Sequence, residues 1–413
     1  MIHTKTFDSG LQLAFKRSHS QVAYVALAVK SGTRNEPAEH SGIAHLTEHM
    51  LFKGTEKRNP EQISNRLEVL GGDLNAYTAK EETVLYSTVL KEDASKAVDL
   101  LLELAFTSTF PQDELDKERS VVIDEINMYK DSPSECIFEE FEKILFAPST
   151  LERPILGTAR SLRHISSEDL RAYVKAGFRP ENMCIAIVAG FTPQKAEKIV
   201  QQAAAKYIPE SYRALPSVAV PGQAPALSPV TPFYKEVAKK NHQVNCIIGT
   251  TAFSCYDERR MELSLLANIL GGPSSNSLLN QKLREKNALV YTVDCSYTQF
   301  ADNGSALIYF GCEKPNLDRC IALVHEELSR LRDKPLSEKN LRIAKRQLLG
   351  QLAVASDNFE ALVLSMAKSM IVFGRFMPDE EIRRRILDIT PQRLQQTAAE
   401  VFAPERLSTL IFK

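Results

Sequence analysis

The chain has 413 residues, of which 44% are hydrophobic and 25% charged. This composition is typical of a globular protein, and the length is too great for one ordinary hydrophobic core, so we expect two or more domains. The formal net charge of -1 at pH 7 argues against general nucleic-acid binding, which usually requires an excess of basic residues.

The beginning of the chain and its cysteines indicate where in the cell the protein is expected. Residues 1–8 contain no apolar segment of signal-peptide length, and no uninterrupted apolar run of about 18 residues occurs, so we expect no membrane segment. The 7 cysteines include no Cys-x-x-Cys pair. They indicate reduced thiols in a cytoplasmic protein.

The first half of the chain alternates strand and helix patterns. Two β-rich runs, 24–29 and 83–90, flank a helical stretch through 45–52. Apolar residues then recur every three or four positions over 94–105 and 113–129, which predicts two amphipathic helices.

A proline-rich segment divides the chain near its middle. Residues 212–232 contain five prolines, which fix φ and remove backbone donors, so we expect an extended linker between a domain over 1–211 and a domain over 233–413. The second half repeats the coarse order of the first and predicts an α+β fold used twice. Its expected strands are 243–248, 290–297 and 306–311, and its expected helices are 259–270, 317–331 and 337–354.

The sharpest chemical feature is the segment His45-Leu46-Thr47-Glu48-His49. On a helix, residues four apart lie on one face, so His45 and His49 can direct their imidazoles at one metal ion. Glu48 lies on nearly the same face and can act as the general base on a metal-bound water without being a ligand. Zinc, one ion per chain, is the metal that this donor set favours, although manganese or cobalt suits the same shell.

Two histidines require a third protein ligand. The predicted helix over 113–129 offers Glu118 and Glu125, which are seven residues apart and therefore share a face. Spacing does not choose between these two carboxylates, and it leaves Glu114 and Asp124 open as well.

The segment from Gly42 to Thr55 resembles the zinc segment of the pitrilysin family, in which His-x-x-Glu-His is the inverted form of the better-known zinc motif. That family includes insulin-degrading enzyme and the mitochondrial processing peptidase. The resemblance is strongest over residues 31–129 and 270–297. It implies two homologous domains, each a mostly antiparallel sheet with helices packed on one face.

The resemblance also implies site residues. Glu125 matches the family's third zinc ligand. Glu118 matches a glutamate that contacts the ligands and tunes the site without binding the metal. Asn75 and Ala76 lie in a segment that resembles the family's substrate-binding strand, whose edge pairs with an extended peptide. In the second half, Arg284 and Tyr291 match a pair that contacts the substrate near the scissile bond.

We therefore expect a zinc metalloendopeptidase that hydrolyses peptides or unfolded polypeptides in a chamber. Since the zinc motif and the Arg284–Tyr291 pair occur on one chain, we expect a homodimer in which this pair of one protomer completes the zinc site of the other. The alternative is a non-catalytic assembly subunit, or a processing subunit that requires a different partner chain.

Overall fold

The computed structural model describes residues 2–212, 225–239 and 243–413. The chain divides into two compact units, and each unit takes segments from both sides of the predicted linker. The first unit is Met1–Asn127, Arg153–Val220 and Val354–Pro378, and the second is Met128–Glu152, Pro221–Ala353 and Asp379–Lys413. Residues 213–224 of the predicted linker lie outside the described residues.

The first unit is organised around a six-stranded sheet in the order β1-β2-β6-β3-β5-β4. All neighbouring strands are antiparallel except β2 and β6, which are parallel. The strands are β1 (Ile2–Thr6), β2 (Gln12–Arg17), β3 (Val22–Val29), β4 (Asn75–Thr78), β5 (Thr83–Leu90) and β6 (Met183–Ala189). The short strand β4 forms one edge of this sheet.

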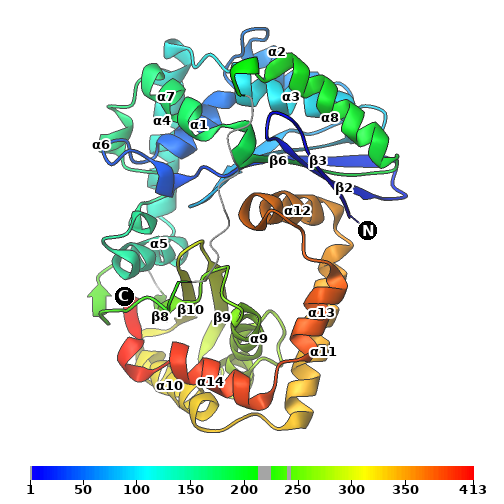
Figure 1. The fold of residues 1–413 in the computed structure, drawn as a ribbon. Coiled ribbons are helices and arrows are strands. Elements are labelled where there is room, and N and C mark those ends of the chain that lie inside the picture. The colour runs from blue at the N-terminus through cyan, green and yellow to red at the C-terminus, as the bar shows by residue number, and fades with distance from the viewer. Residues whose placement is uncertain (1, 213–224, 240–242) are drawn as a thin grey trace. The chain divides into compact units, whose positions relative to one another are not determined.

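Both faces of this sheet are buried, and the residues of β3 show why. Val25, Leu27 and Val29 point to one face, which packs on helices that include α1, α3 and α8. The smaller Ala26 and Ala28 point to the other face, where α12 packs as a single helix (Figure 1). The helices assigned to this unit are α1 (Ile43–Leu51), α2 (Pro60–Glu68), α3 (Ala94–Thr107), α4 (Gln112–Lys130), α6 (Ala159–Leu162), α7 (Ser167–Gly177), α8 (Pro193–Tyr207) and α12 (Phe359–Phe373).

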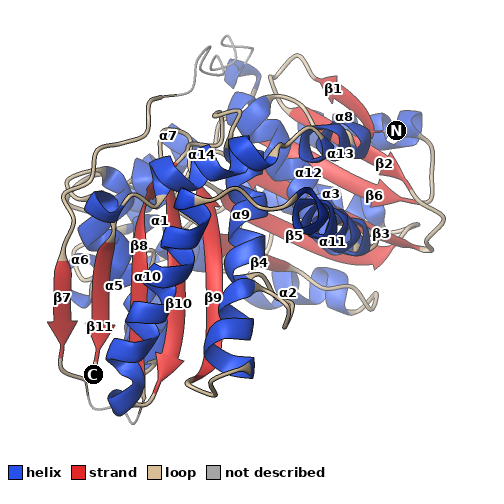
Figure 2. Ribbon diagram, turned by 90° about the horizontal axis from the view of Figure 1, so that it is seen from below, coloured by secondary structure: helices blue, strands red, loops and turns tan. Residues whose placement is uncertain are grey.

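The second unit has a five-stranded sheet in the order β7-β11-β8-β10-β9, which Figure 2 shows strand by strand. Its strands are β7 (Tyr234–Val237), β8 (Val244–Ala252), β9 (Val290–Gln299), β10 (Gly304–Cys312) and β11 (Ser408–Phe412). One face packs on α9 (Arg260–Gly271), α10 (Leu317–Asp333), α11 (Glu338–Ser356) and α14 (Pro391–Val401). The other face packs on α5 (Pro133–Phe146), through Ile137 and Phe141. Helix α13 (Asp379–Leu387) and a π-helical segment (Asn280–Glu285) complete the unit.

The two sheets share one pairing pattern. The order β2-β6-β3-β5-β4 in the first sheet corresponds to β7-β11-β8-β10-β9 in the second, with a parallel first pair and antiparallel pairs thereafter. The predicted α+β architecture, with two mostly antiparallel sheets, is confirmed. The prediction placed helices on one face only, whereas the structure adds one further helix, α12 or α5, to the opposite face of each sheet.

The predicted elements agree with the structure to within a few residues at each end. The strand predicted over 83–90 is β5, and the helix predicted over 113–129 is α4. None of the 7 cysteines forms a disulfide, and six of them are buried. No helix among the described residues is long and apolar enough to cross a membrane.

Candidate metal centre

The site begins with helix α1, whose start is fixed by a buried carboxyl group. Glu36 is only 5% exposed, and its carboxyl oxygens accept hydrogen bonds from the backbone N–H groups of Gly42 and Ala44. These donors would otherwise be unsatisfied at a helix N-terminus. Gly42 has φ of 91°, and a Cβ there would lie 2.8 Å from the Cα of Gly157, so the close approach requires glycine. Burial raises the pKa of Glu36 to about 8.

His45, His49 and Glu125 come together on the helices α1 and α4. One ligand atom from each residue lies within 4.8 Å of the others. The Glu125 Oε2 atom is 3.8 Å from Nε2 of His45 and 3.7 Å from Nε2 of His49. Both imidazoles therefore present the same ring nitrogen to one carboxylate, with room between the three atoms for an ion.

The protonation of His45 suits a metal ligand. Burial, with a smaller effect from His49, lowers the pKa of His45 to about 4, so its imidazole is neutral at pH 7. Neutral imidazole is the form that donates a lone pair to a metal. The Nδ1 atom of His45 is buried and has no hydrogen-bond partner within the described part of the chain.

Glu118 contacts His49 at the ring nitrogen that does not face Glu125. Its Oε2 lies 3.0 Å from Nδ1 of His49, and its Oε1 lies 2.7 Å from Nζ of Lys53. Burial raises the pKa of Glu118, but the hydrogen bonds from Lys53 and His49 outweigh it and hold the pKa below its usual value. An ionised carboxylate can only accept a hydrogen bond, so this contact favours the His49 tautomer that donates from Nδ1–H, and it leaves Nε2 as the nitrogen that faces Glu125.

Glu48 has a different partner. The hydroxyl of Thr78, on the edge strand β4, donates to Oε2 of Glu48 at 2.6 Å. Burial raises the pKa of Glu48, and this hydrogen bond opposes the rise. The contact fixes the orientation of a carboxylate that is not part of the His45–His49–Glu125 cluster, as the general-base interpretation requires.

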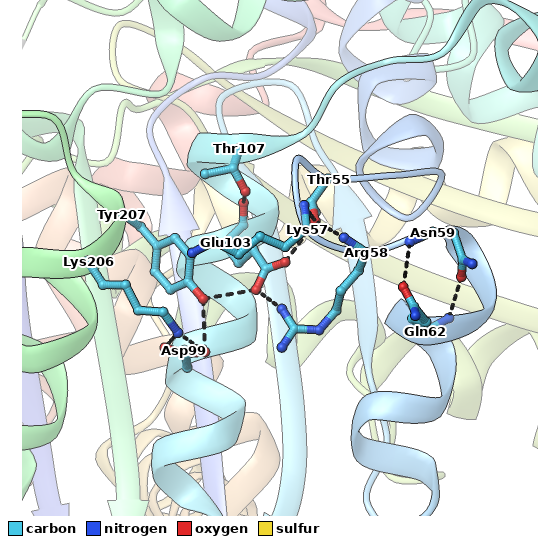
Figure 3. A network of polar contacts seen from close by, with 10 residues as sticks. All are labelled: Thr55, Lys57, Arg58, Asn59, Gln62, Asp99, Glu103, Thr107, Lys206 and Tyr207. Carbon is cyan, nitrogen blue, oxygen red and sulfur yellow. Dashed lines mark hydrogen bonds and ion pairs between the residues drawn. The ribbon is translucent and has the colours of Figure 1, made fainter.

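A second buried carboxylate holds the segment that follows α1. Glu103, on α3, is fully buried, and Figure 3 shows its carboxylate between Thr55, Arg58 and Tyr207. The Thr55 hydroxyl donates to Glu103 at 2.7 Å, the Tyr207 hydroxyl donates at 2.9 Å, and Arg58 forms an ion pair with it. The hydrogen bonds pull the pKa of Glu103 below its usual value despite burial, so the group stays ionised. The start of helix α1 and the segment after it are thus each held by a buried glutamate outside the metal cluster.

The remaining predicted residues have separate positions. Glu114 pairs with Lys117, and Asp124 is exposed, so neither joins the cluster. Asn75 and Ala76 lie on the edge strand β4. Arg284 and Tyr291 belong to the second unit: Arg284 is on the π-helical segment, and Tyr291 is on β9 with 66% of its surface exposed.

Sequence reasoning missed four residues that support the site: Glu36, Lys53, Thr78 and Glu103. Thr78 stands in the segment predicted as the substrate strand, but only the fold brings its hydroxyl to Glu48. The other three are joined to their partners by contacts that no local periodicity reveals.

Two sequence models of protein families match the chain. Residues 13–159 match the family described as Insulinase (Peptidase family M16), and residues 164–348 match the Peptidase M16 inactive domain. The chain belongs to peptidase family M16, the pitrilysin family. The first match contains the whole His45–His49–Glu125 cluster, and the second contains Arg284 and Tyr291.

Relatives in family M16 extend over nearly the whole chain. The uncharacterized zinc protease YmxG of Bacillus subtilis is 28% identical over 415 residues, covering 100% of this chain and 98% of the relative. The uncharacterized zinc protease SCO5738 of Streptomyces coelicolor is 29% identical over 405 residues, covering 97% of this chain and 87% of the relative. A protease from Helicobacter pylori has the same fold, with a TM-score of 0.88, 20% identity and coverage of 100% and 99% of the two chains.

Proposed function

We propose that this M16 chain is a zinc-dependent endopeptidase that hydrolyses peptides or unfolded polypeptides. The observation that carries the proposal is the convergence of His45, His49 and Glu125, whose ligand atoms lie within 4.8 Å of one another. Two imidazoles and one carboxylate are a donor set that catalytic zinc sites use, with a fourth position open to water or substrate.

Each residue has a proposed role. His45, His49 and Glu125 hold one zinc ion, and Glu118 orients His49. Bound zinc supplies a Lewis acid that activates a water molecule for attack on the peptide carbonyl. Glu48, held by Thr78, accepts a proton from the attacking water and passes it to the leaving amine.

The substrate is proposed to lie along β4. Because β4 is an edge strand, its free backbone groups can pair with an extended peptide beside Asn75 and Ala76. Thr78 stands on the same strand and contacts Glu48, so peptide bound there would lie next to the general base. Arg284 and Tyr291 are proposed as further substrate contacts, supplied in a homodimer by the partner protomer.

Hydrolysis of a quenched fluorescent peptide tests the proposal. Purified chain is assayed before chelation, after chelation and after zinc is restored. We expect activity that is lost with the metal and regained with it. A zinc-loaded chain that cleaves nothing in a broad peptide library would instead favour an assembly role or a role that requires a different partner chain.

A further inference from the structure

A groove lies between helices α11 and α13 of the second unit, and none of the residues that line it belongs to the metal cluster. Figure 1 labels both helices. Its volume is about 730 Å³. Its apolar lining includes Leu341, which is 1% exposed, with Leu349 half-buried and Leu387 47% exposed at the rim. The Lys345 Nζ atom donates to the Leu387 carbonyl at 2.7 Å and ties the two walls together. The groove therefore has an apolar floor, and a hydrogen bond joins its two walls.

The rim of the groove carries unpaired positive charge. Arg342, Arg346 and Arg383 line it, and none of these three exposed guanidinium groups has an ion-pair partner in the part of the chain that the structure describes. Arg342 and Arg346 are four residues apart on α11, where like charges on one helix face repel. Glu338, at one end, is the only acidic residue among those that line the groove.

A glycine in the same place has no structural role within the described residues. Gly350 lies in the interior of α11, where glycine costs about 0.5–1 kcal/mol relative to alanine. Its φ is not positive, and a Cβ added there would meet nothing within 4 Å, so neither the backbone nor packing requires glycine. The missing side chain leaves the groove open over the helix backbone, together with Ala353 one turn later. Small residues on a helix face allow another backbone to approach closely.

We propose that this groove docks an amphipathic helical segment of another polypeptide, with its apolar face on the leucines and its carboxylates on Arg342, Arg346 and Arg383. Guanidinium groups form charge-assisted hydrogen bonds with carboxylates, and a helix in an apolar groove is a common mode of peptide recognition. The leucine floor distinguishes this surface from one for nucleic acid, and its concave shape distinguishes it from one for a membrane. The docking does not depend on hydrolysis and goes beyond the proposed peptidase activity.

Binding of synthetic peptides tests the proposal. The probe is a fluorescein-labelled peptide with leucines every three or four positions and glutamates on the flanks, and its counterpart carries lysines in place of the glutamates. Anisotropy is measured on the full chain with Glu48→Gln, so that the peptide survives the measurement. We expect the acidic probe to bind and to weaken with added salt, and the basic counterpart not to bind.

Substitutions test whether the acidic probe binds in the groove. The double substitution Arg342→Glu and Arg346→Glu should weaken the acidic probe by about tenfold or more, whereas Lys339→Glu, an exposed position on α11 outside the groove, should change binding far less. Gly350→Leu should block the groove, whereas Ala355→Leu, also exposed and outside it, should not.

Three results would overturn the proposal. One is equal binding of the acidic and basic probes, and another is an equal effect of the groove and control substitutions. The third is light scattering that shows a wild-type dimer and a Gly350→Leu monomer, with no probe bound, since a second copy of the chain would then cover the groove. Probe binding by the Glu48→Gln chain, together with no peptide hydrolysis by the wild-type chain, would leave the groove proposal intact and remove the peptidase proposal instead.

Discussion

Replacing Glu118 with alanine should weaken metal binding without unfolding the protein. The Glu118 side chain is 10% exposed and lies 3.0 Å from Nδ1 of His49. A hydrogen bond to a charged group contributes about 1.5–3 kcal/mol. Its loss should therefore weaken zinc affinity by about 10–100-fold, which is also the usual effect of removing a partner that orients a metal-binding histidine. In the variant, Lys53 loses the same carboxylate, but the Lys53 side chain is 28% exposed, so water can take the place of that carboxylate.

The zinc dissociation constant of Glu118→Ala can be measured by competition with a chromophoric chelator. Glu114→Ala is the matched control, because Glu114 lies on the same helix and pairs with Lys117 away from the cluster. Circular dichroism of both variants checks the fold. Equal zinc affinities in Glu118→Ala and Glu114→Ala would refute the reasoning that Glu118 orients His49.

Substitutions at three further residues test the contacts around α1. Glu103→Gln should lower the free energy of unfolding by about 2 kcal/mol, because Arg58 and two hydroxyls lose an ionised acceptor. This loss corresponds to a fall in Tm of roughly 4–8 °C, measured by calorimetry. An unchanged Tm would contradict the prediction. Thr78→Val should lower kcat by about tenfold with zinc content unchanged, since Glu48 loses its orienting donor, and Thr78→Ser should restore most of the activity. Glu36 has a pKa of about 8 in the folded protein against 4.5 in the unfolded chain. Between these two pH values the folded protein keeps a proton that the unfolded chain releases. The free energy of unfolding should therefore fall as pH rises from about 5 to 8. Glu36→Gln should reduce that fall in urea denaturation, and an identical pH dependence in both proteins would exclude the assignment.

The local elements were predictable because each carries its own periodic pattern. The alternation over 83–90 matches β5, and the motif His45-Leu46-Thr47-Glu48-His49 lies on α1 with both histidines on one face. Seven-residue spacing placed Glu118 and Glu125 on one face of α4, but could not assign their contacts. The structure separates them, since Glu118 faces Nδ1 of His49 whereas Glu125 faces the two Nε2 atoms.

What the sequence could not predict depends on contacts between distant residues. Ala26 and Ala28 do show that the second face of β3 is apolar, but not that α12, more than 300 residues later, covers it. The hydroxyl of Thr78 reaches Glu48 across 30 residues of chain, and Thr55 reaches Glu103 across 48. These partners are set by the packing of α1 against its neighbours.

Zinc content and peptide turnover of Glu48→Gln and His45→Ala, measured side by side with the wild type, test the proposed chemistry most directly. We predict that Glu48→Gln binds as much zinc as the wild type but hydrolyses peptide about 10²–10⁴-fold more slowly, because it lacks the general base. We predict that His45→Ala loses both zinc and activity. Equal zinc loss in the two variants, or wild-type turnover by zinc-loaded Glu48→Gln, would contradict the assigned roles.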